Sequence, residues 1–593
     1  MRQTRTASLL CFLWWATVLA VVPGALGFVL NLDPSGQPRR WLLSAPHPLV
    51  STNIVNPATK AVRYFLAADA YTATNAAAEL NAIRAAFSQW QSVPGTSLKF
   101  EEGGLVPPGA DGNTSDQTNL IFWAKNSLWV NNGRDYIFGM IAVTYPRVLG
   151  ENTLAEADIV LNGVQVRWFT DINDTNSTRQ FVESTVLHEI GHLIGLEHSP
   201  VGGATMFAWG AEGVSTHVGL SRDEIAAAQL LYPGAPLEAG HLRGQVLINS
   251  TAVFGAAVIA EDAAGNVVSG TVTRENGWYE LPGLPPGNYQ VRVTPLDPAA
   301  ANSLYRLVPG SDIASAFAGA MTGFLPSVNT PAAVVAGATQ TLDFSVTPGE
   351  PAFRITRIRP PTRESDFFNA INAAASIRLG QSNWIVGVYS PNLPGSGATL
   401  KVTGDGLALG ASSFTTVTFS GTTPSLNLIS IRVSVSPEAT PGLRSFVVQQ
   451  GTNTAIANGF LEVLPAFPDD NFDSLDDSFQ RRYFPLFTSA EASPGADPDG
   501  DALENRGEFL AGTNPTNASS VLRIEQVTVA PSGTTLAWQS VPGRRYQVSG
   551  RSQLGSETWQ PLGVPVSASG TSTQFVDPSE KTNVRFYRVE VLP

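Results

Sequence analysis

Three histidines and one glutamate lie within eleven residues of one another, at a spacing suited to a catalytic metal. His188 and His192 are four residues apart, so a helix would present both imidazoles on one face. Gly195 can adopt a positive φ, which would end the helix and return His198 to the same metal. Three protein ligands leave one zinc position for water, and Glu189 would lie beside that water as a general base. The pattern therefore predicts a catalytic zinc site.

The alternative interpretation of this segment is a buried amphipathic helix that carries incidental histidines. The sequence has only six histidines among its 593 residues, and three of them fall in this window. The glutamate after the first histidine and the glycine before the third complete an extended motif, which favours metal binding over chance.

The segment 187–199 resembles the metzincin zinc peptidases, and most of all their matrixin branch, the relatives of the matrix metalloproteinases. Metzincins carry a methionine in a tight turn beneath the metal, and the resemblance places Met206 there; a gap-filling core methionine is the alternative. Residues 220–233 resemble the closing helix of matrixin catalytic domains. The resemblance covers residues 61–234 and implies an α/β metzincin fold with one catalytic zinc.

The chain departs from animal matrixins in two respects. Residues 48–187 contain no histidine, so the second, structural zinc of those enzymes is not expected. The only cysteine, Cys11, precedes the peptidase region, so latency through a propeptide cysteine on the zinc is not expected either. Asp158, Asp171 and Asp174 are candidates for a structural calcium, with solvated loop carboxylates as the favoured alternative.

Local patterns predict the elements that position the zinc ligands. In matrixins the edge strand of the sheet holds the substrate backbone, and the resemblance places this role in residues 139–145. A helix over residues 178–194 is expected to carry the first two histidines. Ser221 and Glu224 have the spacing of a capping box at the start of the closing helix. Other expected elements are strands at 61–67, 138–146 and 157–161, and a first helix with Leu80, Ile83, Phe87 and Trp90 on its apolar face.

Length and composition indicate an exported multidomain protein. Residues 1–27 have the arginines, apolar core and small-residue end of a signal peptide; a membrane anchor is the alternative, but the apolar core is short for one. With its only cysteine in that leader, the remaining chain has no disulfide, which is typical of bacterial secreted proteins. A net charge of −13 argues against nucleic acid or anionic membranes as partners. We expect a monomer without a membrane anchor.

Beyond residue 234 the composition shifts to glycine, proline, serine, threonine and valine in short alternating runs, which predicts all-β sandwich modules. Residues 241–346 resemble the carboxypeptidase regulatory-like domain through 244–246, 277–279 and 284–289. The expected organisation is a signal peptide at 1–27, the peptidase domain at 28–234, sandwiches at 241–346, 351–465 and 520–593, and a calcium-loop linker at 467–517.

The linker contains an acidic run with the spacing of an EF-hand calcium loop. Glu508 falls twelfth from Asp497 counted inclusively, but Ala502 stands where such loops have glycine. A preceding loop is degenerate, because Gln480 replaces its terminal glutamate. The segment also resembles the calcium-linker repeats of bacterial exoproteins, and an acidic solvated linker is the alternative. The candidate ligands are Asp497, Asp499, Asp501, Asn505 and Glu508, and those of the degenerate loop are Asp469, Asn471, Asp473, Asp477 and Gln480.

Two classes of function follow from these patterns. The first is a secreted zinc endopeptidase that cleaves proteins or peptides, with Glu189 as its base. The second is an adhesion protein whose β modules bind glycan or extracellular matrix and whose peptidase domain is subsidiary or inactive. The intact Glu189 favours the first, since inactivated relatives usually lose this base.

Overall fold

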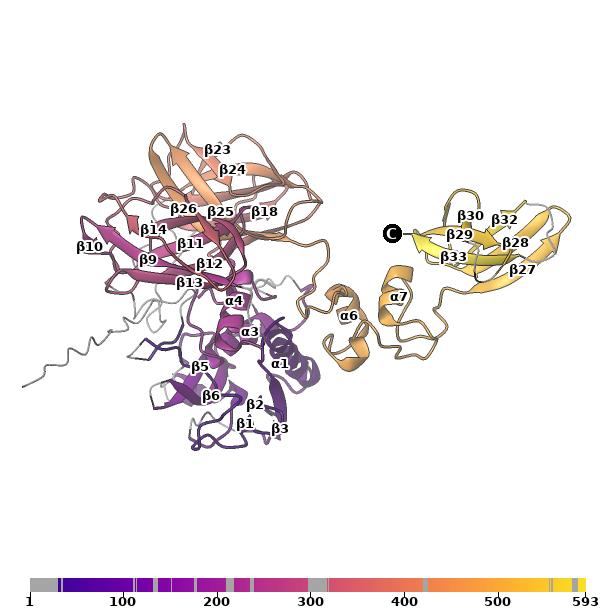
Figure 1. Ribbon diagram of the computed structural model, residues 1–593, viewed down its shortest axis with the longest axis horizontal. Coiled ribbons are helices and arrows are strands. Elements are labelled where there is room, and N and C mark those ends of the chain that lie inside the picture. The colour runs from indigo at the N-terminus through magenta and orange to yellow at the C-terminus, as the bar shows by residue number, and fades with distance from the viewer. Residues whose placement is uncertain are drawn as a thin grey trace, which may run out of the picture.

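The structure is a computed structural model of the 593-residue chain. It describes residues 30–592 except for 34–35, 110–111, 113–114, 132–136, 151, 175–178, 209–217, 235–238, 297–316, 318, 420–424, 554, 556–557 and 579–584. The expected signal peptide lies outside these residues. Figure 1 shows an N-terminal α/β module below two β modules, and a helical linker that leads to a separate C-terminal β module. No helix among the described residues is long and apolar enough to cross a bilayer.

The N-terminal module contains a six-stranded sheet in the order β1-β2-β4-β6-β5, with β3 also paired to β2. All residues of β4 and β6 are buried, as expected for central strands covered on both faces. Strand β5 runs antiparallel to β6 at the end of this order and is only partly buried. The elements are β1 (Val55–Asn56), β2 (Ala61–Ala67), α1 (Ala76–Gln91), β3 (Phe100–Val106), β4 (Leu120–Ala124), α2 (Ser127–Asn131), β5 (Ala142–Leu149), β6 (Thr153–Asn162), β7 (Trp168–Phe169), β8 (Gln180–Phe181), α3 (Val182–Leu193) and α4 (Arg222–Leu231).

Most of the expected elements are present, with three corrected boundaries. The strand expected at 157–161 is longer at both ends and spans Thr153–Asn162 as β6. The helix expected at 178–194 begins only at Val182, because Gln180 and Phe181 first pair in parallel with β7. The strand expected at 138–146 begins at Ala142 and continues to Leu149, since its antiparallel pairing with β6 extends that far. The predicted apolar face of α1 is buried, and Trp90 donates its indole N–H to the Leu187 carbonyl of α3 at 2.8 Å. Helix α1 therefore fixes the helix that carries the histidines.

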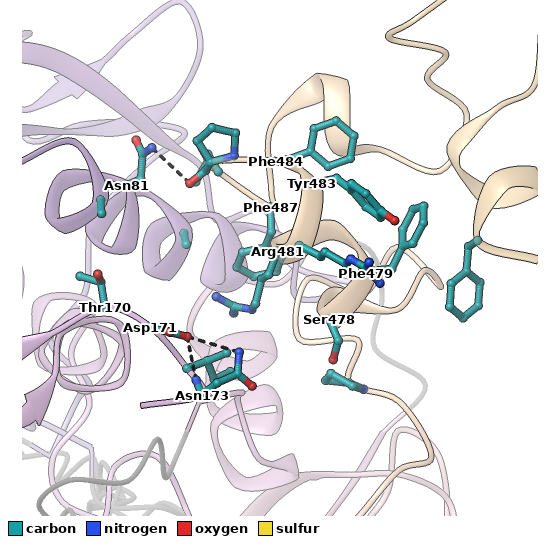
Figure 2. Close-up of a pocket in the computed structure, with 18 of the residues that line it drawn as sticks. Asn81, Thr170, Asp171, Asn173, Ser478, Phe479, Arg481, Tyr483, Phe484 and Phe487 are labelled. Atoms are coloured by element: carbon teal, nitrogen blue, oxygen red, sulfur yellow. Dashed lines mark hydrogen bonds between the residues drawn. The ribbon is translucent and has the colours of Figure 1, made fainter. Parts of the chain in front are cut away.

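The linker contacts the N-terminal module through α6 (Asp477–Tyr483). Arg481 reaches from α6 toward the N-terminal module, and a dashed line joins Asn81 of α1 to the chain after α6 (Figure 2). Arg481 pairs with Glu183 of α3 at 2.6 Å, and both side chains are largely buried. The linker also contains a short 3₁₀ turn at Ala490–Ala492 and α7 (Asn505–Ala511).

The two middle β modules share one sheet. Strand β12 of the first pairs with β25 of the second through Val267 and Leu443, so the order β15-β14-β11-β12-β25-β26-β19 crosses from one module to the next. The first module has β9 (Gly240–Ile248), β10 (Thr251–Ala252), β11 (Ala256–Asp262), β12 (Val267–Val272), β13 (Trp278–Leu284), β14 (Gly287–Pro295), β15 (Thr330–Val334), β16 (Thr339–Thr341) and β17 (Phe344–Ser345). The second has β18 (Arg357–Thr362), β19 (Ala375–Arg378), β20 (Trp384–Ser390), β21 (Thr399–Val402), β22 (Leu407–Leu409), β23 (Ser413–Val417), β24 (Leu426–Val435), β25 (Gly442–Gln450) and β26 (Asn453–Leu464).

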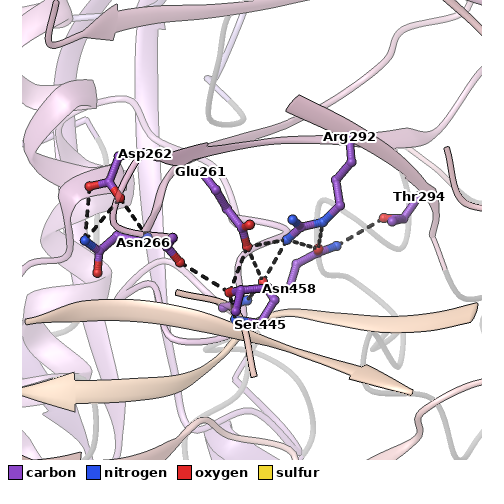
Figure 3. A network of polar contacts seen from close by, with 10 residues as sticks. Glu261, Asp262, Asn266, Arg292, Thr294, Ser445 and Asn458 are labelled. Carbon is purple, nitrogen blue, oxygen red and sulfur yellow. Dashed lines mark hydrogen bonds and ion pairs between the residues drawn. The ribbon is translucent and has the colours of Figure 1, made fainter. Parts of the chain in front are cut away.

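A buried polar network crosses this shared sheet (Figure 3). The Arg292 guanidinium donates to Glu261 Oε1 and to Ser445 Oγ, each at 2.7 Å. It also donates to Asn458 Oδ1 at 2.9 and 3.0 Å through two nitrogens. Because Arg292 and Glu261 come from the first module and Ser445 and Asn458 from the second, the network fixes the two modules against each other.

The C-terminal module consists of two small sheets around Trp538 and Tyr546, which are buried. Trp559 lies outside this core and is half-buried, with the guanidinium groups of Arg551 and Arg588 over its ring. Its strands are β27 (Ile524–Ala530), β28 (Gly533–Gln539), β29 (Arg545–Arg551), β30 (Gln560–Pro561), β31 (Val566–Ser567), β32 (Ser572–Asp577) and β33 (Phe586–Leu592).

Candidate metal centre

Helix α3 and the turn that follows it bring three imidazoles together. His188 and His192 lie one turn apart on α3. Gly195 has a φ of +105°, and a Cβ on it would lie 2.2 Å from the Arg39 carbonyl oxygen, so only glycine fits this turn. The turn returns His198 to the other two rings, and the three ring centroids are 4.9 to 5.1 Å apart. The predicted triad is therefore assembled in the fold.

Each of the two histidines on α3 has its Nδ1 atom held by a main-chain carbonyl. His188 Nδ1 lies 2.7 Å from the Thr205 oxygen, and His192 Nδ1 lies 2.8 Å from the Leu196 oxygen. A carbonyl only accepts, so each Nδ1 carries the proton and each Nε2 presents a lone pair. His188 Nε2 and His198 Nε2 are 3.2 Å apart. Two Zn–N bonds of about 2.0–2.1 Å at a tetrahedral angle would separate two nitrogens by about 3.4 Å, so the donor set fits zinc.

Glu189 lies next to the triad and is held by the edge strand. Its side chain is buried, and the Thr144 hydroxyl of β5 donates to Glu189 Oε2 at 2.7 Å. The same hydroxyl lies 2.9 Å from the Glu189 main-chain oxygen. The contact orients the carboxylate and joins α3 to the edge strand. Thr144 was not expected from the sequence, because no local pattern distinguishes this threonine from any other on a strand.

Met206 packs against α3, where the resemblance places it. A Cβ on Gly191 would lie 2.1 Å from the Met206 sulfur, so the thioether fills the space left by that glycine. Met206 donates its main-chain N–H to Glu224 Oε1 at 2.9 Å, and Glu224 also closes the predicted capping box with Ser221. The methionine turn is therefore fixed by the start of α4. The adjacent Thr205 carbonyl orients His188.

The residue after the third histidine is anchored on the first β module. Ser199 donates its hydroxyl to Asp223 Oδ2 at 2.7 Å, and the Gly270 N–H of β12 donates to Asp223 Oδ1 at 3.0 Å. Burial, followed by the charge of Glu224, raises the pKa of Asp223 to about 7. The β modules thus buttress the loop that carries His198.

The three aspartates considered for a calcium in this module differ in their burial and in their hydrogen-bond partners. Asp158 is buried and accepts the Leu120 N–H at 2.9 Å, so it is not the solvated loop carboxylate expected. Asp174 pairs with Arg179, and Asp171 caps the turn at Asn173. Among the described residues, the acidic group close enough to share a cation is instead Asp497, Asp499 and Asp501 of the linker, whose carboxylate oxygens lie within 4.8 Å of one another.

Comparisons with known proteins assign families to two parts of the chain. The matrixin family matches residues 57–233, and the carboxypeptidase regulatory-like domain matches residues 241–347. No curated protein matches the chain.

Several solved structures show a weak likeness. BcpA, the major pilin subunit of Bacillus cereus, is 10% identical over 38% of this chain and 69% of its own, with a TM-score of 0.14. Its D312A variant is 8% identical over 60% of this chain and 88% of its own, also with a TM-score of 0.14. The Bacillus anthracis TIE protein is 9% identical over 60% and 46%, with a TM-score of 0.13. Scores this low support no statement about fold or function. The family matches agree with the fold and the triad, and residues 57–233 are therefore a matrixin domain of the metallopeptidase type, followed by a carboxypeptidase regulatory-like domain at 241–347.

Proposed function

We propose that the protein is a zinc-dependent endopeptidase whose zinc is held by His188, His192 and His198. The observation that carries the proposal is the convergence of the three imidazoles, two of them with Nδ1 fixed by a main-chain carbonyl. When bound there, zinc supplies Lewis acidity and makes water acidic enough to attack a peptide carbonyl near neutral pH.

In this proposal Glu189 is the general base. It takes a proton from the attacking water and delivers it to the nitrogen of the leaving amine. The Thr144 hydroxyl on Oε2 limits rotation of the carboxylate, so that the base is oriented before substrate arrives. The largely buried position of Glu189 strengthens its interactions with charges that develop in the transition state.

The proposed substrate is an extended peptide segment that adds to the outer edge of β5. The strand ends the described sheet, and its residue Thr144 contacts the proposed base directly. Main-chain hydrogen bonds along 142–145 would hold the peptide without regard to its side chains. This position agrees with the role expected for residues 139–145.

The test measures zinc content and peptide hydrolysis separately. His192→Ala should lose zinc because two imidazoles do not hold it tightly, whereas His47→Ala, a histidine outside the site, should retain both zinc and activity. Glu189→Ala should keep zinc and fold but lose roughly 10²–10⁴-fold or more in turnover. A His192→Ala protein with full zinc, or a Glu189→Ala protein with normal turnover, would refute the assignment.

The adhesion alternative is less well supported, because the proposed base is intact and oriented and all three proposed ligands are present and converge. The leader-like pattern of residues 1–27 supports action outside the cell. The expected domain division remains part of the proposal, and it includes 467–517 as a calcium-binding linker. The clustered carboxylates of Asp497, Asp499 and Asp501 support that assignment.

A further inference from the structure

Two twelve-residue loops of the linker, 469–480 and 497–508, have the same backbone features at corresponding positions. The first runs into α6 and the second into α7. The sixth residue of each has a left-handed conformation, with φ of 65° at Ser474 and 73° at Ala502. Ala502 therefore adopts the conformation for which calcium loops usually have glycine. The departure in sequence does not change the shape of the second loop.

The first loop is closed by its own amide groups. Gln480, its twelfth residue, donates its side-chain N–H to Asp473 Oδ2 at 2.7 Å. Asn471 donates to the same oxygen at 3.0 Å and lies 3.2 Å from Gln480 Oε1. The amide hydrogens thus neutralise Asp473 Oδ2, and of the carboxylate oxygens of this loop only Asp477 Oδ1 is a buried atom without a hydrogen-bond partner among the described residues.

The second loop has oxygens but no donors in the same position. Its twelfth residue is Glu508, which is fully buried, and within the described part of the chain neither of its carboxylate oxygens has a hydrogen-bond partner. The same holds for Asp499 Oδ2 and Asp501 Oδ2, which are buried atoms. Asn505 donates its amide N–H groups to two main-chain carbonyls, and its Oδ1 has no donor among these residues. Asp497 completes the acidic group.

Such an arrangement is costly without a positive charge. Buried polar atoms are almost always paired, and unpaired buried carboxylates cost several kcal/mol each as an order of magnitude. Burial, and then the charges of Asp499, Asp501 and Asp497, raise the pKa of Glu508 to about 7, against the lowering effect of the neighbouring Thr513 hydroxyl. Calcium takes six to eight oxygens at about 2.3–2.6 Å, so oxygens on opposite sides of one ion are about 4.6–5.2 Å apart. The carboxylate oxygens of the three aspartates, within 4.8 Å of one another, fit one such ion.

We propose that the linker binds a single divalent cation of the calcium class, in the second loop only, while the first loop is closed by amides and needs none. The inference rests on the proposed calcium-binding linker and specifies which loop binds and how many ions. The difference lies in the twelfth residue, where Gln480 donates a hydrogen bond and Glu508 offers only acceptors.

The two loops consequently have different tasks. Arg481, which follows the first loop on α6, donates to both Glu183 carboxylate oxygens of the zinc helix, at 2.6 and 2.8 Å. Asn81 of α1 donates to the Pro485 carbonyl oxygen at 3.2 Å, so the docking involves both helices (Figure 2). None of these contacts includes a residue of the second loop. Removing the cation should therefore loosen residues 497–517 and leave α6 docked on the matrixin domain.

The experiment counts calcium ions on the zinc-loaded full chain by equilibrium dialysis and titration with calcium chloride. The parent protein should bind one ion, Glu508→Gln none, and Glu504→Gln, the same change at an exposed position, one. Gln480→Glu combined with Asn471→Asp removes the internal donors of the first loop and should raise the count to two. Gln480→Glu alone provides a second variant should the double variant fold poorly.

The possible outcomes separate this inference from the calcium linker itself. No calcium on the parent would overturn both. Two ions on the parent would support the calcium linker but refute the proposal that only the second loop binds an ion. A count that stays at one in a folded Gln480→Glu or double variant would also refute that proposal. Limited proteolysis gives an independent readout: calcium withdrawal should open cleavage sites within 497–517, whereas new cleavage within 467–487 would refute the separate tasks of the two loops.

Discussion

The buried ion pair at the joint of the two middle β modules predicts a large and specific loss of stability. Arg292 and Glu261 have side chains that are only 1% and 4% exposed, and their charged atoms are 2.7 Å apart. Arg292→Met keeps much of the side-chain volume but leaves Glu261 charged and buried. Breaking a buried pair by removing one partner costs roughly 3–5 kcal/mol. For β modules of this size that corresponds to a fall of roughly 6–20 °C in melting temperature.

The matched control is the exposed pair between Arg222 and Asp262, with side chains 44% and 20% exposed and charged atoms 2.8 Å apart. Arg222→Met removes the same charge and should cost only about 0–1 kcal/mol, because water screens this pair. Differential scanning calorimetry of the full chain would compare the transition of the β modules in both variants. Arg292→Met/Glu261→Gln should recover much of the loss, since the stranded charge is gone. If Arg292→Met melts no lower than Arg222→Met, the reasoning is wrong.

Three further predictions concern the metal centre. Thr144→Val should reduce turnover by roughly 10–100-fold with zinc content unchanged, since a hydrogen bond to a charged group contributes about 1.5–3 kcal/mol. Thr144→Ser keeps the hydroxyl and should retain most activity. Equal turnover of the two variants would contradict an orienting role for Thr144. Asp223 has a raised pKa in the folded state, so its contribution to stability is fully present below about pH 4 and is lost as pH rises through about 7. Asp223→Asn should therefore make the midpoint of urea unfolding depend less on pH over that range. An unchanged pH dependence of the midpoint would show that other groups cause it. Gly195→Ala should destabilise the turn to His198 and weaken the retention of zinc at increasing chelator concentrations. The positive φ costs about 1–3 kcal/mol for alanine, and the overlap of its Cβ with the Arg39 carbonyl adds to that cost. Zinc retention equal to that of the parent would contradict the need for glycine.

The cluster of three histidines was predictable because its information is local. Helical spacing places His188 and His192 on one face, and glycine at 195 permits the return of His198. The capping box of α4 and the apolar face of α1 were predictable for the same reason, since each depends on residues three or four positions apart. Even the alanine at 502 could be weighed from sequence, although only the structure shows that it adopts the left-handed conformation.

Contacts between distant segments were decided only by the tertiary structure. Thr144 meets Glu189 because β5 is the edge strand beside α3, and Asp223 receives Gly270 because the first β module packs on α4. The shared sheet of the two middle modules and the Arg481–Glu183 pair join residues far apart in the chain. Short-range steric and hydrogen-bond preferences depend on neighbouring residues and can be predicted from them. Packing depends on which surfaces bury one another, and the sequence of one segment does not specify the segment against which it packs.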